Sequence, residues 1–158
     1  MLVAQTMEKL PANWIVERSD GFVPSSILSF AKDEVGTNVT NAILEEIFKS
    51  YDPYDWSIYA RAVQKVIQRF CPRVIFSGRC GELTILPYEL FYPLHYTLWK
   101  LYFKVGAFTN FEPPYTYHMW NRLSYNQVIE KDTPYEVLAR KHCPSIYEMY
   151  GDQFDIKI

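Results

Sequence analysis

The sequence predicts a mixed α/β fold, rich in helix, for a chain of 158 residues. Two stretches carry apolar residues at helical spacing, several short runs are β-branched or aromatic, and a capping-box sequence lies near the C-terminus. The length corresponds to about one domain. With 49% apolar residues the chain can form a core without metal or disulfide support. We therefore expect a single domain over residues 1–158.

The first 37 residues carry frequent helix and strand breakers. Pro11, Gly21, Pro24 and Gly36 interrupt them, which predicts irregular structure. Two short apolar runs within this region remain candidates for strands, Trp14–Val16 and Ile27–Leu28.

Two amphipathic helices follow. The first is expected over 38–50, with Val39, Ala42, Ile43 and Ile47 on one face and Glu45, Glu46 and Lys49 opposite. The second is expected over 56–70, with apolar positions at Tyr59, Ala62, Val63, Val66, Ile67 and Phe70. Cys71-Pro72 ends it, because proline cannot continue a helix.

Short strands are expected after the helices. Val74–Phe76 and Leu83–Leu86 are candidates, joined by a turn at Gly78–Gly81. The aromatic segment Leu90–Phe103 leaves its secondary structure open. A short buried strand is expected within Tyr115–Trp120.

Two helix-start signals stand near the C-terminus. Thr133-Pro134-Tyr135-Glu136 is a capping box with proline at the first helical position, which predicts a helix to about His142. Ser145-Ile146-Tyr147-Glu148 repeats the capping-box spacing and predicts a last short helix.

Composition excludes several classes of protein. A formal net charge of -2 excludes nucleic-acid binding driven by a basic field. The sequence contains no stretch of about 18 apolar residues, so no membrane span is predicted. The first residues lack the features of a signal peptide. Aromatic residues make up 17% of the chain, enough both for burial and for stacking on a ligand such as a sugar.

The cysteines and one sequon bear on cellular location. Cys71 and Cys80 lie close together and Cys143 stands apart, which suits one disulfide and a free thiol or, equally, three free thiols. Asn38-Val39-Thr40 would be a glycosylation acceptor in a secreted chain.

One histidine stands out by its neighbours. The sequence has no P-loop, no Gly-x-Ser-x-Gly, no dinucleotide fingerprint and no zinc spacing. His118 ends a predicted strand and is followed by Trp120, Asn121 and Arg122. The imidazole could ligate a metal, the amide could bind a hydroxyl and the guanidinium could bind a phosphate through two hydrogen bonds. From spacing alone, a hydrogen-bonded core histidine is the better-supported reading.

Several blocks in order resemble the α-1,4-glycosyltransferases, the family of lactosylceramide 4-α-galactosyltransferases and α-1,4-N-acetylglucosaminyltransferases. Leu86–Pro93 with Trp99–Phe103 is similar to a family block, and His118-Met119-Trp120-Asn121-Arg122 resembles the family's His-x-Trp-Asn-Lys. His142-Cys143-Pro144 resembles a later element, and Trp56 looks like a tryptophan before an acceptor-side loop. The resemblance covers roughly residues 10–152.

The resemblance implies a GT-A, Rossmann-like fold of which this chain would be the C-terminal portion. It implies retaining transfer of galactose or N-acetylglucosamine from a UDP-sugar to a glycolipid or glycan. It further implies a divalent cation, usually manganese, and a Golgi-lumen location. An N-terminal anchor is expected in the full-length protein, and nucleic acid is not an expected partner.

Site residues follow from the same resemblance. His118 would be a metal ligand, Arg122 a diphosphate contact in place of the family's lysine, and Trp120 and Asn121 parts of the donor pocket. The family also tends to carry a cysteine pair where Cys71 and Cys80 fall. The Asn38 sequon fits the implied luminal location.

Two departures from the family pattern lead to an alternative. The Asp-x-Asp metal motif is absent, as expected if it precedes the matched part, and Ser57–Arg61 replaces the family's Asn-Gly-Pro loop. The alternative is a degenerate relative that binds glycans or a partner enzyme without catalysis.

Overall fold

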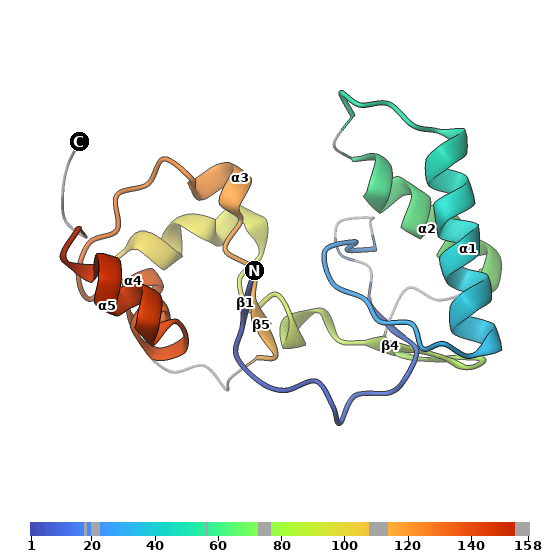
Figure 1. The fold of residues 1–158 in the computed structure, drawn as a ribbon, viewed down its shortest axis with the longest axis horizontal. Coiled ribbons are helices and arrows are strands. Elements are labelled where there is room, and N and C mark those ends of the chain that lie inside the picture. Colours follow the sequence, from blue (N-terminus) through green and yellow to red (C-terminus); the bar gives the residue numbers. More distant parts are fainter. Residues whose placement is uncertain (18, 20–22, 56, 73–76, 108–113, 154–158) are drawn as a thin grey trace. The chain divides into compact units, whose positions relative to one another are not determined.

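The computed structural model describes residues 1–17, 19, 23–55, 57–72, 77–107 and 114–153. These residues form two compact units (Figure 1). The first unit is Glu8–Tyr88, and the second combines Met1–Met7 with Glu89–Ile158. Both contain helices and short strands, so the mixed α/β prediction is confirmed. The expected single domain over 1–158 and the GT-A fold stay predictions.

A three-stranded sheet organises the first unit. Its order is β2 (Trp14–Val16), β4 (Leu83–Leu86), β3 (Gly78–Cys80), with β2 parallel and β3 antiparallel to β4. A parallel pair needs a long crossover, and α1 (Glu34–Lys49) and α2 (Ile58–Phe70) lie in the chain between β2 and β4. The predicted strands 14–16 and 83–86 are confirmed.

Elsewhere in this unit the structure differs from the predicted strands and turn. Gly78–Cys80, expected in a turn, forms β3, and the chain turns at Gly81, whose φ of 59° suits a residue without Cβ. Ile27–Leu28 is not a strand; Ser29 instead forms an isolated antiparallel bridge with Trp14. The predicted strand Val74–Phe76 lies outside the described residues.

Helix α1 begins four residues earlier than the sequence pattern predicts. Asp33 caps it, accepting a hydrogen bond from the Gly36 backbone N–H at 2.7 Å. Asn13 donates to the same carboxylate at 2.8 Å and accepts from the Ala31 N–H at 2.8 Å. These two hydrogen bonds to Asp33, the one from Gly36 first, lower the pKa of its carboxyl group. Gly36, read as a breaker, is therefore inside the helix.

The two helices pack against each other and on the sheet (Figure 1). Leu83 and Ile85 alternate with half-buried neighbours along β4, so one face of the strand is buried. Tyr59 and Phe70, predicted on the apolar face of α2, are instead exposed, because that helix is buried along a narrower stripe. The core of this unit comprises Ile15, Val23, Val39, Ile43, Val63, Val66, Ile67, Cys71, Leu83 and Ile85.

The expectation for Glu46 on the first helix is also wrong. Predicted to face water, it is only 4% exposed and binds Lys65 and Arg69 of α2, with Arg69 Nη2 2.8 Å from its carboxylate. The hydrogen bond from Lys65, and then the one from Arg69, lower the pKa of the Glu46 carboxyl group despite its burial. The packing of α1 on α2 thus buries a paired charge.

We expect Glu46→Gln to lower the melting temperature at neutral pH, because the amide loses both ion pairs. A lowered carboxyl pKa stabilises the fold above pH 4.5, and this contribution is lost as the pH falls through the lower folded pKa. Wild type should therefore lose more stability than Glu46→Gln between pH 6 and pH 3, measured by thermal unfolding. Glu45→Gln, in an exposed pair with Lys49, is the matched control. Equal acid sensitivity of wild type and Glu46→Gln would contradict the role of this carboxylate.

The second unit joins the start of the chain to its last third. β1 (Leu2–Val3) pairs antiparallel with β5 (Thr116–Tyr117). The strand expected within Tyr115–Trp120 is confirmed but shorter. The aromatic segment left open forms 3₁₀ helix η2 (Tyr96–Phe103), after the short η1 (Tyr88–Leu90). The core here comprises Leu94, Tyr102, Tyr117 and Leu138.

Three short helices and a final 3₁₀ turn complete this unit. They are α3 (Asn121–Ser124), α4 (Pro134–His142), α5 (Pro144–Tyr150) and η3 (Gly151–Gln153). Thr133 caps α4, so the predicted helix start is confirmed; the buried Glu136 accepts from the N–H of Asp132, one residue before the cap. The second capping box is wrong: α5 begins at Pro144 after Cys143, which places Ser145 inside the helix. No described helix is long and apolar enough to cross a membrane.

Candidate functional site

The segment His118–Arg122 follows strand β5 directly and turns sharply. Trp120 has φ 50° and ψ 43°, in the left-handed region that bulky residues rarely adopt. Such a conformation persists only where the surroundings hold it, and it is common at functional sites. The turn ends the strand and starts α3 at Asn121.

Several hydrogen bonds hold this turn. The Trp120 backbone N–H donates to Nδ1 of His118 at 3.2 Å, and its indole N–H donates to the Leu94 carbonyl at 3.1 Å. The hydroxyl of Ser124 donates to the Met119 carbonyl at 2.8 Å. The left-handed residue is thus fixed from both sides by its neighbours.

Aromatic rings surround the same turn. His118 stacks on the buried Tyr92 with ring centroids 5.3 Å apart, and its centroid lies 4.2 Å from that of Trp120. Tyr96, which is exposed, meets the indole edge-on at 6.0 Å. Trp120 therefore packs within an aromatic cluster and uses its indole N–H internally.

Asn121 and Arg122 are exposed in the first turn of α3. Their positions follow from the left-handed Trp120, which redirects the chain away from β5. An exposed amide can bind hydroxyl oxygens, and an exposed guanidinium can bind phosphate oxygens through two parallel hydrogen bonds. Asn121 and Arg122, two of the three predicted donor-contact residues, therefore lie in the first turn of this helix, directly after Trp120.

Burial sets the charge of His118. It lowers the pKa of the imidazole to about 4, so the ring is neutral near neutral pH. A neutral imidazole can ligate a metal, but its Nδ1 already accepts the Trp120 N–H. Among the described residues no three His, Cys, Asp or Glu side chains gather as a metal site.

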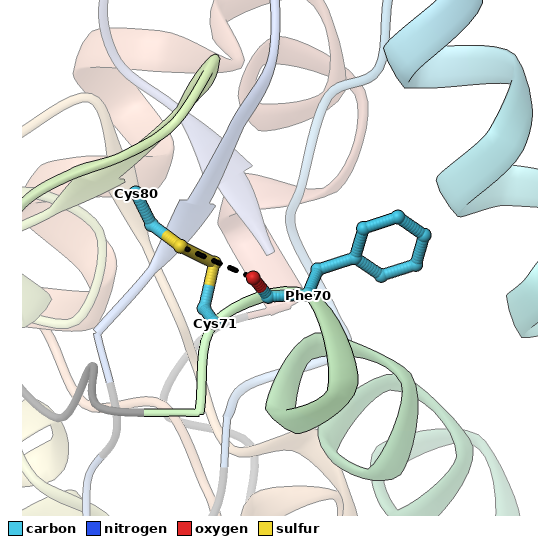
Figure 2. The surroundings of a disulfide bond; sticks show 3 residues. All are labelled: Phe70, Cys71 and Cys80. Atoms are coloured by element: carbon cyan, nitrogen blue, oxygen red, sulfur yellow. Dashed lines mark hydrogen bonds between the residues drawn. A yellow bond between two sulfur atoms is a disulfide. The ribbon is translucent and has the colours of Figure 1, made fainter.

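The cysteine pairing implied by the family resemblance is present. Cys71, after the end of α2, forms a disulfide with Cys80 of β3, nine residues on (Figure 2). Sγ of Cys80 also lies 3.5 Å from the Phe70 carbonyl oxygen. Cys143 is a free thiol. The disulfide ties a helix end to the edge of the sheet.

The predicted glycosylation acceptor is in a helix. Asn38 is exposed within α1. An exposed side chain leaves room for a glycan, and modification there stays a prediction.

The stretch that replaces the family's acceptor-side loop is helical. Ser57 precedes the first turn of α2, and Asp55 accepts hydrogen bonds from the Ser57 N–H and hydroxyl and from Arg61. The hydrogen bonds from Ser57 and Arg61 lower the pKa of Asp55 to about 2. Sequence reasoning missed this cluster, although an Asp two residues before a helix-start serine was a usable signal. Trp56, part of the resemblance, lies outside the described residues.

The protein thus has a mixed α/β fold, in which the exposed side chains of Asn121 and Arg122 follow strand β5. Residues 32–150 match the alpha 1,4-glycosyltransferase conserved region, and the chain belongs to this glycosyltransferase family. Over 73 residues it is 36% identical to human alpha-1,4-N-acetylglucosaminyltransferase. That match covers 44% of this chain and 22% of the human enzyme, so the chain spans only a small part of this relative. No solved structure matches the chain.

Proposed function

We propose that the chain is the C-terminal region of a retaining hexosyltransferase of the Golgi lumen. The enzyme moves galactose or N-acetylglucosamine from a UDP-sugar to a glycolipid or glycan hydroxyl. Family membership supports the transferase class. The choice between these two sugars, the retaining mechanism, the acceptor and the location belong to the proposal.

The His118–Arg122 turn is the observation that carries the proposal. As UDP leaves, negative charge develops on its diphosphate, and a fixed guanidinium stabilises it most when held in place beforehand. The left-handed Trp120 fixes the start of α3, where Arg122 and Asn121 are exposed. Arg122 contacts the diphosphate, Asn121 hydrogen-bonds donor oxygens, and the ring of Trp120 forms the pocket wall.

The divalent cation of the family, manganese, is part of the proposal for the whole enzyme. When bound, such an ion neutralises charge on the leaving diphosphate. The described residues do not assemble its ligands, so we assign it to the full-length protein and assign no step to it here.

We expect Arg122→Ala to weaken UDP binding about 10- to 100-fold in the full-length protein, because a bidentate charged contact is lost. Asn121→Ala should weaken it less, by about 3- to 10-fold, since one neutral hydrogen bond is removed. Calorimetric titration with UDP measures both. Lys141→Ala, an exposed cation on α4, is the matched charge control and should leave binding unchanged.

Two results would count against the donor site. One is UDP affinity that Arg122→Ala and Lys141→Ala change equally. The other is UDP affinity that neither Arg122→Ala nor Asn121→Ala changes, in protein that melts as wild type does.

A second candidate function is glycan or partner binding without catalysis. The observation that favours it is the helical Ser57–Arg61 stretch, where Arg61 is paired to Asp55 and the family's loop is absent. Full-length protein that binds glycans but neither hydrolyses nor transfers from UDP-galactose or UDP-N-acetylglucosamine would establish this alternative. Turnover of either donor would exclude it.

A further inference from the structure

We infer that His118 is a positioning residue that holds the Trp120 turn through Nδ1, and that it does not ligate a metal. The contact that carries this inference is the hydrogen bond from the Trp120 backbone N–H to Nδ1 of His118, 3.2 Å long. The donor and acceptor are two residues apart in the chain, and the hydrogen bond closes the left-handed turn.

The direction of this hydrogen bond fixes the tautomer. A ring nitrogen that accepts an N–H must present a lone pair, so the single proton of the neutral imidazole is on Nε2. Metal binding through Nε2 needs the lone pair there and moves the proton to Nδ1, where it faces the Trp120 N–H. In this conformation the turn and a metal at Nε2 therefore exclude each other.

The imidazole is also fixed in its plane. Tyr92 is buried and stacks on the ring with planes 27° apart, and the plane of the Trp120 ring is tilted by 45° to the imidazole. Reorienting His118 toward a metal would give up these contacts together with the hydrogen bond. The packing of the rings thus supports the same role for Nδ1.

A side-chain acceptor two residues before a left-handed residue has a known substitute. Asparagine commonly accepts from the backbone N–H two residues on, with its oxygen where histidine carries Nδ1. It has no nitrogen at the position of Nε2. H118N therefore keeps an acceptor for the Trp120 N–H and removes Nε2. H118Q places its amide one carbon further out, nearer the position of Nε2, and loses the acceptor at the position of Nδ1.

The consequence for the donor rests on the proposed function. Because Asn121 and Arg122 directly follow Trp120, loss of the turn displaces both side chains. His118 then acts on UDP through the turn, without touching the ligand.

The test compares H118N, H118Q and H118A in the full-length protein, with H142A as a control outside the turn. Nitrogen NMR of the labelled wild type should show His118 with its proton on Nε2, and the proton should stay there when a diamagnetic divalent cation, magnesium, is added. H118N should melt and bind UDP close to wild type. H118A and H118Q should both melt lower and bind UDP about 3- to 10-fold more weakly, as expected for one lost hydrogen bond.

The opposite results overturn the inference. They are a proton on Nδ1 in the wild type, a proton that moves to Nδ1 when magnesium is added, or H118N as impaired as H118A. If wild type binds no UDP, the proposed function fails, while the tautomer and the order of melting temperatures still decide the role of His118.

Discussion

Gly36→Ala is expected to destabilise the first unit by about 3 kcal/mol or more. A Cβ at Gly36 would lie 2.1 Å from the Ala31 carbonyl oxygen and 2.7 Å from Oδ1 of Asn13. The first of these atoms is backbone and the second is held by hydrogen bonds to Ala31 and Asp33, so neither can move cheaply. The clash would displace the Asp33 cap and the start of α1.

The sign of this stability change shows whether local helix propensity or tertiary packing dominates at Gly36. Glycine to alanine inside a helix normally stabilises by roughly 1 kcal/mol. Thr37→Ala, at the next and exposed position of α1, is the control and should change stability by less than about 0.5 kcal/mol. Denaturant unfolding of both variants measures the difference. A Gly36→Ala protein as stable as wild type would show that the segments do not pack this closely.

Loss of the Cys71–Cys80 disulfide is expected to cost about 2–3 kcal/mol. The bond closes a short loop between the end of α2 and β3, and closing a loop restricts the unfolded chain. The paired variant Cys71→Ala/Cys80→Ala should therefore unfold at lower denaturant. Unlike wild type, it should not be destabilised further by a reducing agent.

Cys143→Ser is the control, since that thiol is free. It should keep both the wild-type stability and the sensitivity to reduction. The unreduced, denatured wild type should carry one reactive thiol. Three reactive thiols, or equal unfolding midpoints with and without reductant, would contradict the disulfide.

Local patterns predicted the elements that depend on neighbouring residues. The apolar spacing of 56–70 indicated α2 to within two residues, because a helix with one buried stripe repeats every three or four residues. The Thr133 capping box predicted the start of α4, because the cap and its partner are three residues apart. Trp14–Val16 predicted a strand from its bulky, β-branched residues.

Patterns failed where a distant segment decided the outcome. The start of α1 depends on Asn13, twenty residues before the Asp33 it binds. Glu46 is buried only because Lys65 and Arg69 reach it from α2. Neither partner can be identified from the sequence around Asp33 or Glu46.

The candidate site divides in the same way. Resemblance to the family found His118, Trp120, Asn121 and Arg122, because their order is a property of the sequence. It could not predict that Trp120 is left-handed or that Nδ1 of His118 is occupied. Both depend on rings and carbonyls supplied by Tyr92 and Leu94.

The sequence by itself determined the family, the helix-rich α/β class and the identity of the polar residues after β5. Tertiary structure decided which charges are buried and paired, where α1 begins, and which nitrogen of His118 accepts a hydrogen bond. The physical reason is how far apart in the sequence the interacting residues lie. Helical spacing and capping join residues a few positions apart, whereas burial, ion pairing and a supported left-handed turn need atoms that only the folded chain brings together.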